Sequence, residues 1–341
     1  MHYRPRILLL EFETMQLLRY KGRRFYDASG NIPLDAFHAE PSAITIGTYD
    51  GVHVGHRKLI AELTRIAAQK NMRSVLITFE PHPRLVVGKK DSQTVKLLTT
   101  LDEKIALLRP LGLDTVVVIE FTKAFSETPP DVFVQDVLMT QLGLSDMVIG
   151  YDHGFGKNRQ GTIDTLRQLA NTGNFGITVV EEQTVGGAHL SSTVIRERLE
   201  HGLIEEANQL LGSAYHLSGT VTRGEARGRT IGFPTANVSV ANAHKLIPKR
   251  GVYVCDALVL GHRFRAMTNI GYRPTVADES RLSIETHLLD FNGDLYGKSI
   301  SIEFLSRLRD EQKFSSIDAL KAQLEADKQA TATYSKELLW N

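Results

Sequence analysis

Gly47-Thr-Tyr-Asp-Gly-Val-His-Val-Gly-His56 is the stretch of sequence that decides the fold of the N-terminal half. It lies between an apolar segment, Ala43–Ile46, and a segment with helical periodicity, Arg57–Lys70. A strand, a glycine-rich turn and a helix in this order predict a phosphate site. The first N–H groups of a helix have no partner within the helix, and they carry partial positive charge.

Glycines and histidines give this turn its predicted chemistry. Gly47, Gly51 and Gly55 lack the Cβ atoms that would keep a nucleotide away from the backbone. His53 and His56 can each donate a hydrogen bond to a phosphoryl oxygen as negative charge builds on it. A His-x-x-His pair also fits a metal site or two ordinary polar turn residues. The pair alone leaves these interpretations open.

The N-terminal half alternates β-branched runs with helical ones. The predicted strands are Ala43–Ile46, Ser74–Phe79, Thr115–Glu120, Met147–Gly150 and Ile177–Val180. The predicted helices are Arg57–Lys70, Leu101–Leu108, Pro130–Leu142 and Ile163–Ala170. This pattern predicts an α/β fold with a parallel, doubly wound sheet, whose site lies at the carboxyl ends of the strands.

Three later segments are suited to form the walls of such a site. They are Thr78-Phe-Glu-Pro-His-Pro83, Gly150-Tyr-Asp-His-Gly-Phe-Gly156 and Leu190-Ser-Ser-Thr-Val-Ile-Arg196. The first also fits a stiff turn, because prolines restrict the backbone. In the second, a glycine-rich loop suits a phosphate or flavin pocket. In the third, the hydroxyl groups can cap a helix or bind a phosphate, and Arg196 can reach the same anion.

The pattern changes after Gly212. One helix, Ile195–Leu211, is predicted to link the two halves. No helix separates the strands predicted beyond it, which indicates an antiparallel β-barrel, and Asn292-Gly293 predicts a hairpin turn. These strands are Leu217–Thr222, Gly251–Leu260, Phe264–Ile270, Leu282–Leu289 and Ser299–Leu305, and a helix, Ile317–Asp327, follows. The predicted domains are residues 15–200 and 215–341, with a linker at 201–214.

A second nucleotide site is predicted in Gly219-Thr-Val-Thr-Arg-Gly-Glu-Ala-Arg-Gly-Arg229 and Ile231-Gly-Phe-Pro-Thr-Ala-Asn237. Glycines let the backbone close over a nucleotide, and arginines bind phosphates. Thr235 and Asn237, after the stiff Pro234, can offer two neutral oxygens to Mg²⁺. A solvated hairpin and a turn with internal hydrogen bonds are the alternative interpretations.

Taken in order, the motifs from Met15 to Asp327 resemble the family of bifunctional bacterial riboflavin kinases and FAD synthetases. Gly51-Val-His-Val-Gly-His56 is similar to the histidine signature of nucleotidyltransferases, and the Gly-Phe-Pro-Thr-Ala-Asn run is similar to the riboflavin kinase signature. The family usually has Phe at the position of Tyr49, and it commonly has Phe and Arg where this chain has His153 and Gly154.

The resemblance implies two ATP-dependent reactions, riboflavin to FMN and FMN to FAD. It implies that His53, His56 and Arg196 act in adenylyl transfer, that Glu285 in Ser283-Ile-Glu-Thr-His287 is the base of the kinase, and that Thr235 and Asn237 bind Mg²⁺. The residues expected to bind ATP, riboflavin or FMN are Gly47, Tyr49, Asp50, Gly51, Gly55, Asp152, Phe155, Gly156, Ser191, Ser192, Thr193, Gly219, Gly224, Arg229, Gly232 and Pro234. From the strand pattern alone, Glu285 is an exposed side chain. An enzyme with one activity and a noncatalytic flavin-binding protein are the alternatives.

Composition limits the other classes of function. A formal net charge of +1 with 23% charged residues argues against nucleic-acid binding. Cys255 is the single cysteine, which excludes an internal disulfide, fits a buried strand residue and is consistent with the cytoplasm. The apolar run Ile7–Leu10 is too short for a signal peptide or a membrane span. A soluble enzyme of small molecules is expected, and the oligomeric state is left open.

Overall fold

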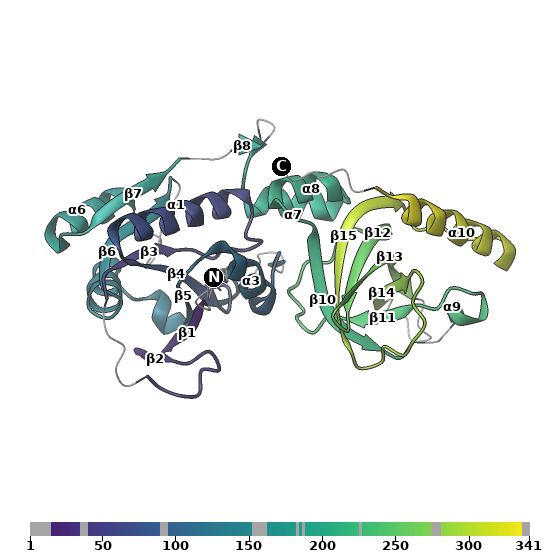
Figure 1. Ribbon diagram of the computed structural model, residues 1–341, viewed down its shortest axis with the longest axis horizontal. Coiled ribbons are helices and arrows are strands. Elements are labelled where there is room, and N and C mark those ends of the chain that lie inside the picture. The colour runs from purple at the N-terminus through teal and green to yellow at the C-terminus, as the bar shows by residue number, and fades with distance from the viewer. Residues whose placement is uncertain are drawn as a thin grey trace, which may run out of the picture. The chain divides into compact units, whose positions relative to one another are not determined.

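The first unit of the computed structural model is built on a seven-stranded sheet (Figure 1). The structure describes residues 15–34, 40–88, 95–151, 162–181, 184–185, 188–224, 227–273 and 281–335. The strands of the sheet are β1 (Gln16–Lys21), β2 (Arg24–Tyr26), β3 (Ser42–Ile46), β4 (Arg73–Glu80), β5 (Thr115–Glu120), β6 (Leu144–Gly150) and β7 (Gly176–Val180). All neighbours in the order β2-β1-β5-β4-β3-β6-β7 are parallel except the antiparallel pair β1–β2. The predicted α/β architecture is confirmed.

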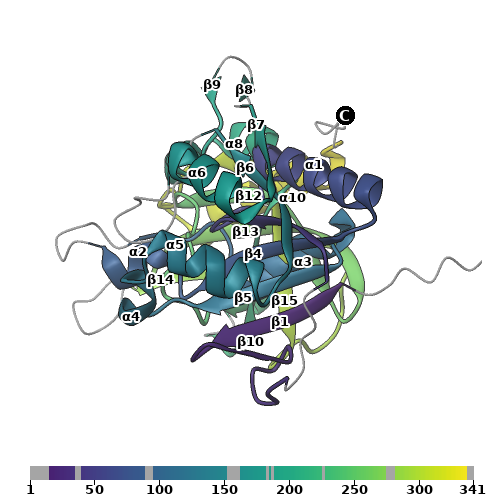
Figure 2. The ribbon, with the colours of Figure 1, turned by 90° about the vertical axis from the view of Figure 1, so that its left-hand side faces the viewer.

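Helices cover both faces of this sheet. They are α1 (Val54–Lys70), α2 (Pro83–Val87), α3 (Leu101–Leu108), η1 (Arg109–Leu111), α4 (Lys123–Ser126), α5 (Pro130–Val132), η2 (Phe133–Met139) and α6 (Ile163–Gly173). Figure 2 shows α1 on one side of the strands and α5 and α6 on the other. Both faces are covered, and every residue of β3 is therefore buried, including the polar Ser42 and Thr45.

The order of the strands reverses at β3. From β3 the chain moves outward through β4 to β5, and it then returns to the other side of β3 to form β6 and β7. In open α/β sheets a ligand binds at such a reversal, outside the carboxyl ends of the strands. The stretch Gly47–His56 leaves the carboxyl end of β3, so the topology puts the histidine motif at this point.

The N-terminal hairpin was not among the predicted strands. Leu18 and Tyr20 of β1 are buried, and Gly22 and Arg23 at the turn both have positive φ, as a tight two-residue hairpin requires. The alternation of apolar and polar residues before Gly22 is the signal that identifies it.

Two predicted helices differ from the observed ones. The segment Pro130–Leu142 contains α5 followed by the π-helix η2, in which the amide of Thr140 bonds to the carbonyl of Gln135. The segment Ile195–Leu211 is wrong as one helix. It forms α7 (Ser192–His201) and α8 (Ile204–Leu211), because Gly202 adopts the left-handed conformation and ends α7.

The second unit contains a closed barrel with the order β10-β11-β14-β13-β12-β15 (Figure 1). All its pairings are antiparallel, which confirms the predicted barrel. Its strands are β10 (Tyr215–Thr222), β11 (Ala236–Ser239), β12 (Gly251–Val259), β13 (His262–Arg273), β14 (Arg281–Leu288) and β15 (Ser299–Arg309). The unit also has α9 (Arg227–Thr230), α10 (Ile317–Thr333) and a small pair, β8 (Thr184–Val185) with β9 (Ala188–His189).

Two predictions about the barrel can be compared with the structure, the hairpin at Asn292-Gly293 and the burial of Cys255. Asn292-Gly293 does not form a hairpin turn, because β14 pairs with β11 and β13, whereas β15 pairs with β10 and β12. That prediction is wrong. Cys255 is fully buried in β12, as predicted.

The two units are not divided at a single position. The first comprises residues 1–49, 56–92 and 105–182, and the second comprises 50–55, 93–104 and 183–341. Part of the histidine stretch therefore belongs to the same unit as the barrel. Over the part of the chain that the structure describes, no helix has the length and apolar character needed to cross a membrane.

Candidate active sites

The histidine motif lies in the connection between β3 and α1 and in the first turn of α1. Helix α1 begins at Val54 rather than at Arg57, so His56 lies in its first turn and His53 directly precedes it. The rings of Tyr49 and His56 meet edge to face, with centroids 5.1 Å apart. Tyr49 is buried, and its hydroxyl lies 2.7 Å from that of Thr45. The ring of Tyr49 therefore packs against the imidazole of His56. The predicted contact of Tyr49 with a nucleotide stays a prediction.

His53 is a buried imidazole. Its side chain and backbone together are 6% exposed, and this burial lowers the pKa of His53 to about 4, although the charge of Asp50 opposes the shift. Arg196 lowers the pKa further. At neutral pH the ring is uncharged, so it offers one N–H donor and one acceptor nitrogen. A fixed donor next to a helix N-terminus suits the stabilisation of a phosphoryl oxygen.

Asp50 organises the turn through hydrogen bonds. Its carboxylate accepts the amides of Leu98 (3.1 Å) and Thr99 (2.9 Å) and pairs with the guanidinium of Arg196 (2.5 Å). Its carbonyl accepts the hydroxyl of Ser192 (2.9 Å). All these partners are within the second unit. The carboxylate of Asp50 is thus engaged by the protein, and its predicted contact with a nucleotide stays a prediction.

Arg196 is held from two directions. Besides the ion pair with Asp50, its Nε donates to the carbonyl of Lys96 at 2.6 Å. A guanidinium has N–H donors beyond those two. Arg196 can thus hold Asp50 and still face an anion, and that second role stays a prediction.

The three hydroxyl residues at the start of α7, Ser191, Ser192 and Thr193, have different contacts. Ser191 is the N-cap residue of α7, and its hydroxyl accepts the amide of Val194 at 3.4 Å. Ser192 bonds to Asp50, whereas Thr193 is exposed. The capping interpretation is therefore correct for Ser191, and phosphate binding by the cluster stays a prediction.

The glycines of the motif make room for protein atoms. A Cβ on Gly51, whose φ is +88°, would lie 2.8 Å from a methyl group of Leu98. At Gly47 a Cβ would meet the ring of Tyr49, and at Gly55 it would meet Leu190 and His53. Close packing of the turn therefore excludes a Cβ at these positions, and the predicted approach of a nucleotide to the three glycines stays a prediction.

Of the segments predicted to form the walls of the site, the structure describes Thr78–Pro83 fully and the glycine-rich loop only at its start. In the first, the hydroxyl of Thr78 donates to the carbonyl of Thr48 at 3.1 Å, and the imidazole of His82 caps α2 by accepting the amide of Arg84. The segment thus spans the end of β4 and the first residue of α2, and its role as a wall of the site stays a prediction. The glycine-rich loop with Asp152, Phe155 and Gly156, and with His153 and Gly154, lies outside the described residues.

The barrel brings the predicted kinase residues together. In the sheet, Asn237 of β11 is directly opposite Glu285 of β14, and Asn269 of β13 is opposite Glu285 on its other side. The hydroxyl of Thr235 lies 3.5 Å from a carboxylate oxygen of Glu285. Glu285 is half-buried, so the interpretation as a fully exposed strand residue is wrong.

The donor set around Glu285 fits a magnesium ion. A hydroxyl, an amide and a carboxylate supply hard oxygen atoms, which are the ligands that Mg²⁺ prefers. Gly224 lies against this set, because a Cβ there would overlap the side-chain amide of Asn237. The carbonyl of Pro234 accepts the imidazole N–H of His287 at 2.7 Å, which fixes the chain just before Thr235.

The other residues predicted to bind a nucleotide in this region are Gly219, Arg229 and Gly232. Gly219 is in β10, where a Cβ would meet the backbone of Ser239. Arg229 and Gly232 are exposed around α9, and Gly232 has a φ of +89°. Their predicted contacts with a nucleotide stay predictions.

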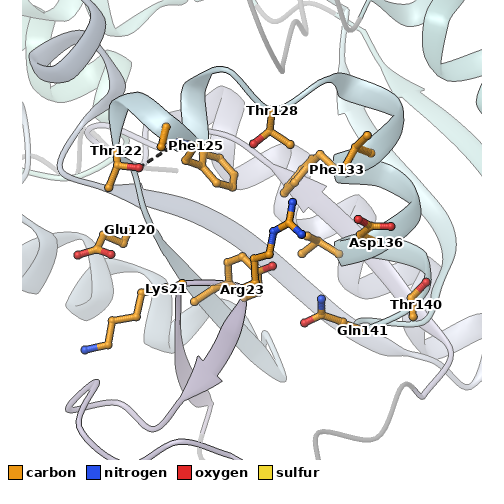
Figure 3. Close-up of a pocket in the computed structure, with 15 residues that line it drawn as sticks. Lys21, Arg23, Glu120, Thr122, Phe125, Thr128, Phe133, Asp136, Thr140 and Gln141 are labelled. Carbon is orange, nitrogen blue, oxygen red and sulfur yellow. Dashed lines mark hydrogen bonds between the residues drawn. The ribbon is translucent and has the colours of Figure 1, made fainter.

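The first unit has a pocket of about 540 Å³ that none of the predicted site residues lines. It lies between the β1–β2 turn, the end of β5 and the π-helix η2. In Figure 3 the side chain of Arg23 extends toward Phe133 and Asp136. The rings of Phe125 and Phe133 form one wall, with centroids 5.6 Å apart.

Sequence reasoning missed the residues that hold Asp50 in place. Leu98 and Thr99 follow Asp50 by 48 and 49 positions, and both act mainly through backbone amides. A backbone donor leaves no trace in residue type, so no local pattern points to them. Asn269 lies opposite Glu285 only because β13 pairs with β14, and a local pattern does not show that pairing.

Comparison with known proteins agrees with this geometry. The sequence model of the FAD synthetase family matches residues 36–194, and that of the riboflavin kinase family matches residues 211–335. The bifunctional riboflavin kinase/FMN adenylyltransferase of Listeria monocytogenes is 42% identical over 295 residues, which cover 86% of this chain and 93% of that protein. The protein of the same description from Bacillus subtilis is 39% identical over 299 residues, covering 87% and 93%.

One solved structure is similar over most of the chain. The crystal structure described as a macrolide-efflux protein from Streptococcus pneumoniae superposes with a TM-score of 0.80 at 28% identity, covering 88% of this chain and 96% of that one. Both family matches, the near-complete coverage of the relatives and the two sites lead to one conclusion: the chain belongs to the family of bifunctional riboflavin kinases/FMN adenylyltransferases.

Proposed function

We propose that the chain carries out its two reactions at two separate sets of residues, with Mg²⁺ bound in the barrel. Riboflavin and ATP give FMN and ADP, and FMN and a second ATP then give FAD and pyrophosphate. The observation that carries the proposal is the coincidence of the His53/His56 turn with the reversal of strand order at β3. The cluster of Thr235, Asn237 and Glu285 supports the second site independently.

In the kinase reaction, Glu285 accepts the proton of the riboflavin 5′-hydroxyl as that oxygen attacks the γ-phosphorus of ATP. A carboxylate next to the attacking hydroxyl serves this role in phosphoryl transfer. Thr235 and Asn237 would hold Mg²⁺, which when bound neutralises phosphate charge. Asn237 and Asn269 flank Glu285 in the sheet, so both strands fix the position of the base.

In adenylyl transfer, a phosphate oxygen of FMN attacks the α-phosphorus of ATP, and pyrophosphate leaves. His53 and His56 donate hydrogen bonds to the phosphoryl oxygens while the charge on them grows. A neutral His53 has one N–H group that can donate such a bond. Ser192, Thr193 and Arg196 steady the triphosphate, and positioning with charge stabilisation is sufficient, so no covalent enzyme intermediate is required.

We also propose that the enzyme works in the cytoplasm on small molecules and without nucleic acid. The near-neutral net charge of +1 supports the absence of a polyanionic partner. The buried thiol of Cys255 is consistent with a reducing compartment.

One assay tests both reactions. The purified chain is incubated with riboflavin, ATP and Mg²⁺, and the flavins are separated by chromatography. We expect FMN first and FAD later. The variant carrying His53→Ala and His56→Ala should accumulate FMN and form no FAD, because the kinase residues are untouched.

The outcomes separate the alternatives. If wild type stops at FMN, the chain has only the kinase activity. If neither FMN nor FAD forms and no ADP or pyrophosphate is released, it is a flavin-binding protein. If the double variant loses FMN formation as well, the assignment of the two reactions to separate residues is wrong.

A further inference from the structure

The second unit contains a buried ion pair that the two reactions do not use. The Nζ atom of Lys245 lies 2.8 Å from a carboxylate oxygen of Glu103, and the two side chains are 0% and 2% exposed. The desolvation of two charges can cost more than their attraction returns, so such a pair is weak evidence for stability. A role in placing other groups explains it better.

On one side, the pair is bonded to the barrel. Lys245 donates to the carbonyl of His216 at 2.8 Å and lies over the ring of Tyr215. Glu103 accepts the amide of Ser218 at 2.9 Å. His216 and Ser218 belong to β10, so both members of the pair are fixed to one strand.

On the other side, the pair is bonded to the segment that holds Asp50. Lys245 donates to the carbonyl of Leu98 at 2.6 Å, and Glu103 accepts the amide of Thr100 at 2.9 Å. Leu98 and Thr99 donate their own amides to Asp50. Leu97 is additionally bonded through its amide and carbonyl to His244 and Leu246, the neighbours of Lys245.

A continuous path of hydrogen bonds therefore runs from β10 through Lys245 and Leu98 to Asp50 and Arg196. Every residue of the path belongs to the second unit. Lys245 is within the riboflavin kinase match, whereas Leu98 and Asp50 are within the FAD synthetase match. His53 follows Asp50 by three positions in the turn before α1, so displacement of Asp50 displaces His53.

We propose that Lys245, together with Glu103, is a positioning residue for adenylyl transfer although it lies in the kinase part of the chain. The inference rests on the proposed function. Lys245 fixes the carbonyl of Leu98, and this fixes the amides that hold the Asp50 carboxylate. Loss of the ammonium group frees that segment and leaves the Glu103 carboxylate buried without its partner.

The test uses the full chain with Lys245→Met, which keeps the length of the side chain. Riboflavin phosphorylation and FMN adenylylation are measured separately, each with its own substrate. Since small misplacements at a reacting centre are costly, we expect kcat of adenylylation to fall about 10-fold or more. KM for FMN should change little, and the kinase should keep its kcat/KM. A barrel that was merely destabilised would lose kinase activity too.

Three further variants sharpen the test. Lys249→Met removes a half-exposed lysine four positions away and should change neither reaction. Lys245→Gln retains an N–H donor and should recover part of the adenylylation rate. The double variant Glu103→Leu with Lys245→Met removes both charges, so it should be more stable than Lys245→Met, and it loses the bonds to the amides of Thr100 and Ser218. It still lacks the donor to Leu98 and should remain slow in adenylylation.

Equal loss of both activities in Lys245→Met, or full adenylylation activity in the double variant, would overturn the proposal. If Lys245→Met does not fold, the double variant is judged by the same criteria. Wild type and the His53/His56 variant are assayed in parallel. Failure of the proposed function appears in those two proteins, whereas failure of this inference appears only in the Lys245 variants.

Discussion

The guanidinium of Arg196 and the carboxylate of Asp50 form an ion pair with an Nη2–Oδ2 distance of 2.5 Å, and their side chains are only 13% and 3% exposed. Burial alone would raise the pKa of Asp50. The charge of Arg196 and the amides of Leu98 and Thr99 outweigh burial and lower the pKa below its usual range. Asp50 is thus an internal anchor for the turn that carries His53.

Asp50→Asn should destabilise the protein and slow adenylylation. Removing one partner of a buried pair leaves the other charge uncompensated, which costs about 3–5 kcal/mol. A carboxyl with a lowered folded pKa adds stability above its unfolded pKa, and this is lost as the pH falls through the folded pKa. The difference between wild type and variant in free energy of unfolding should therefore be largest near pH 7 and shrink below about pH 4.

Urea denaturation across this pH range measures that difference. The matched control is Asp164→Asn, which breaks an exposed pair with Arg167 whose side chains are 64% and 85% exposed. An exposed pair contributes about 0–1 kcal/mol, so this control should change little. A difference for Asp50→Asn that is small and independent of pH would contradict the anchor role.

The pKa of His53 should lie far below that of an ordinary histidine. With a pKa of about 4, it stays neutral through the pH range in which the unfolded chain, near pH 6.5, gains its proton. Because the unfolded state binds the proton first, stability is complete above pH 6.5 and declines as the pH falls toward 4. The loss is of the order of 3 kcal/mol, at 1.36 kcal/mol per pKa unit.

NMR of ¹⁵N-labelled histidine measures this titration directly, and His53→Ala assigns the resonance. The free energy of unfolding of wild type should fall between pH 6.5 and 4 more steeply than that of His53→Ala. A His53 resonance that titrates near pH 6.5 would show that the imidazole is protonated in the working range of the enzyme.

The sequence predicted the parts of the fold that depend on local pattern. Thr115–Glu120 and Leu101–Leu108 have the observed bounds, because buried β-branched runs and helical periodicity are visible over such lengths. The meeting of Thr235, Asn237 and Glu285 was reached through the resemblance to the family. The strand pattern alone made Glu285 an exposed residue, since alternation along one strand does not show what flanks it on the neighbouring strands.

Contacts between distant backbone groups escaped prediction. The function of Asp50 depends on amides of Leu98 and Thr99, and any residue type can supply an amide. Asn292-Gly293 has the local preference for a hairpin, but the barrel closes by pairing β15 with β10 and β12. The turn preference of two residues does not determine which strands pair. Because β14 and β15 pair with other strands, Asn292-Gly293 does not form a hairpin.

Glu285→Gln should abolish riboflavin phosphorylation and leave the adenylylation of added FMN intact. Glutamine keeps the shape and cannot accept the proton, and the loss of a general base costs about 10²–10⁴-fold in kcat. Both rates are measured by chromatography of the flavins. Glu303→Gln is the control, because Glu303 is in the barrel and pairs with Arg263 away from the proposed base. An unchanged kinase rate in Glu285→Gln would remove Glu285 as the base.

Gly224→Ala should weaken the use of Mg²⁺ by the kinase. Its Cβ would overlap the side-chain amide of Asn237, so that amide must move away from Thr235 and Glu285. Changes in groups that orient a metal ligand cost about 10-fold or more in metal affinity. The Mg²⁺ concentration needed for half-maximal FMN formation should rise, and adenylylation should not change. A double-mutant cycle with Asn237→Ala shows whether Gly224 acts through Asn237, since the effects of residues that act through one another are not additive. In the Asn237→Ala background, Gly224→Ala should have little further effect. An equal effect in both backgrounds would mean that Gly224 acts on the nucleotide site without Asn237.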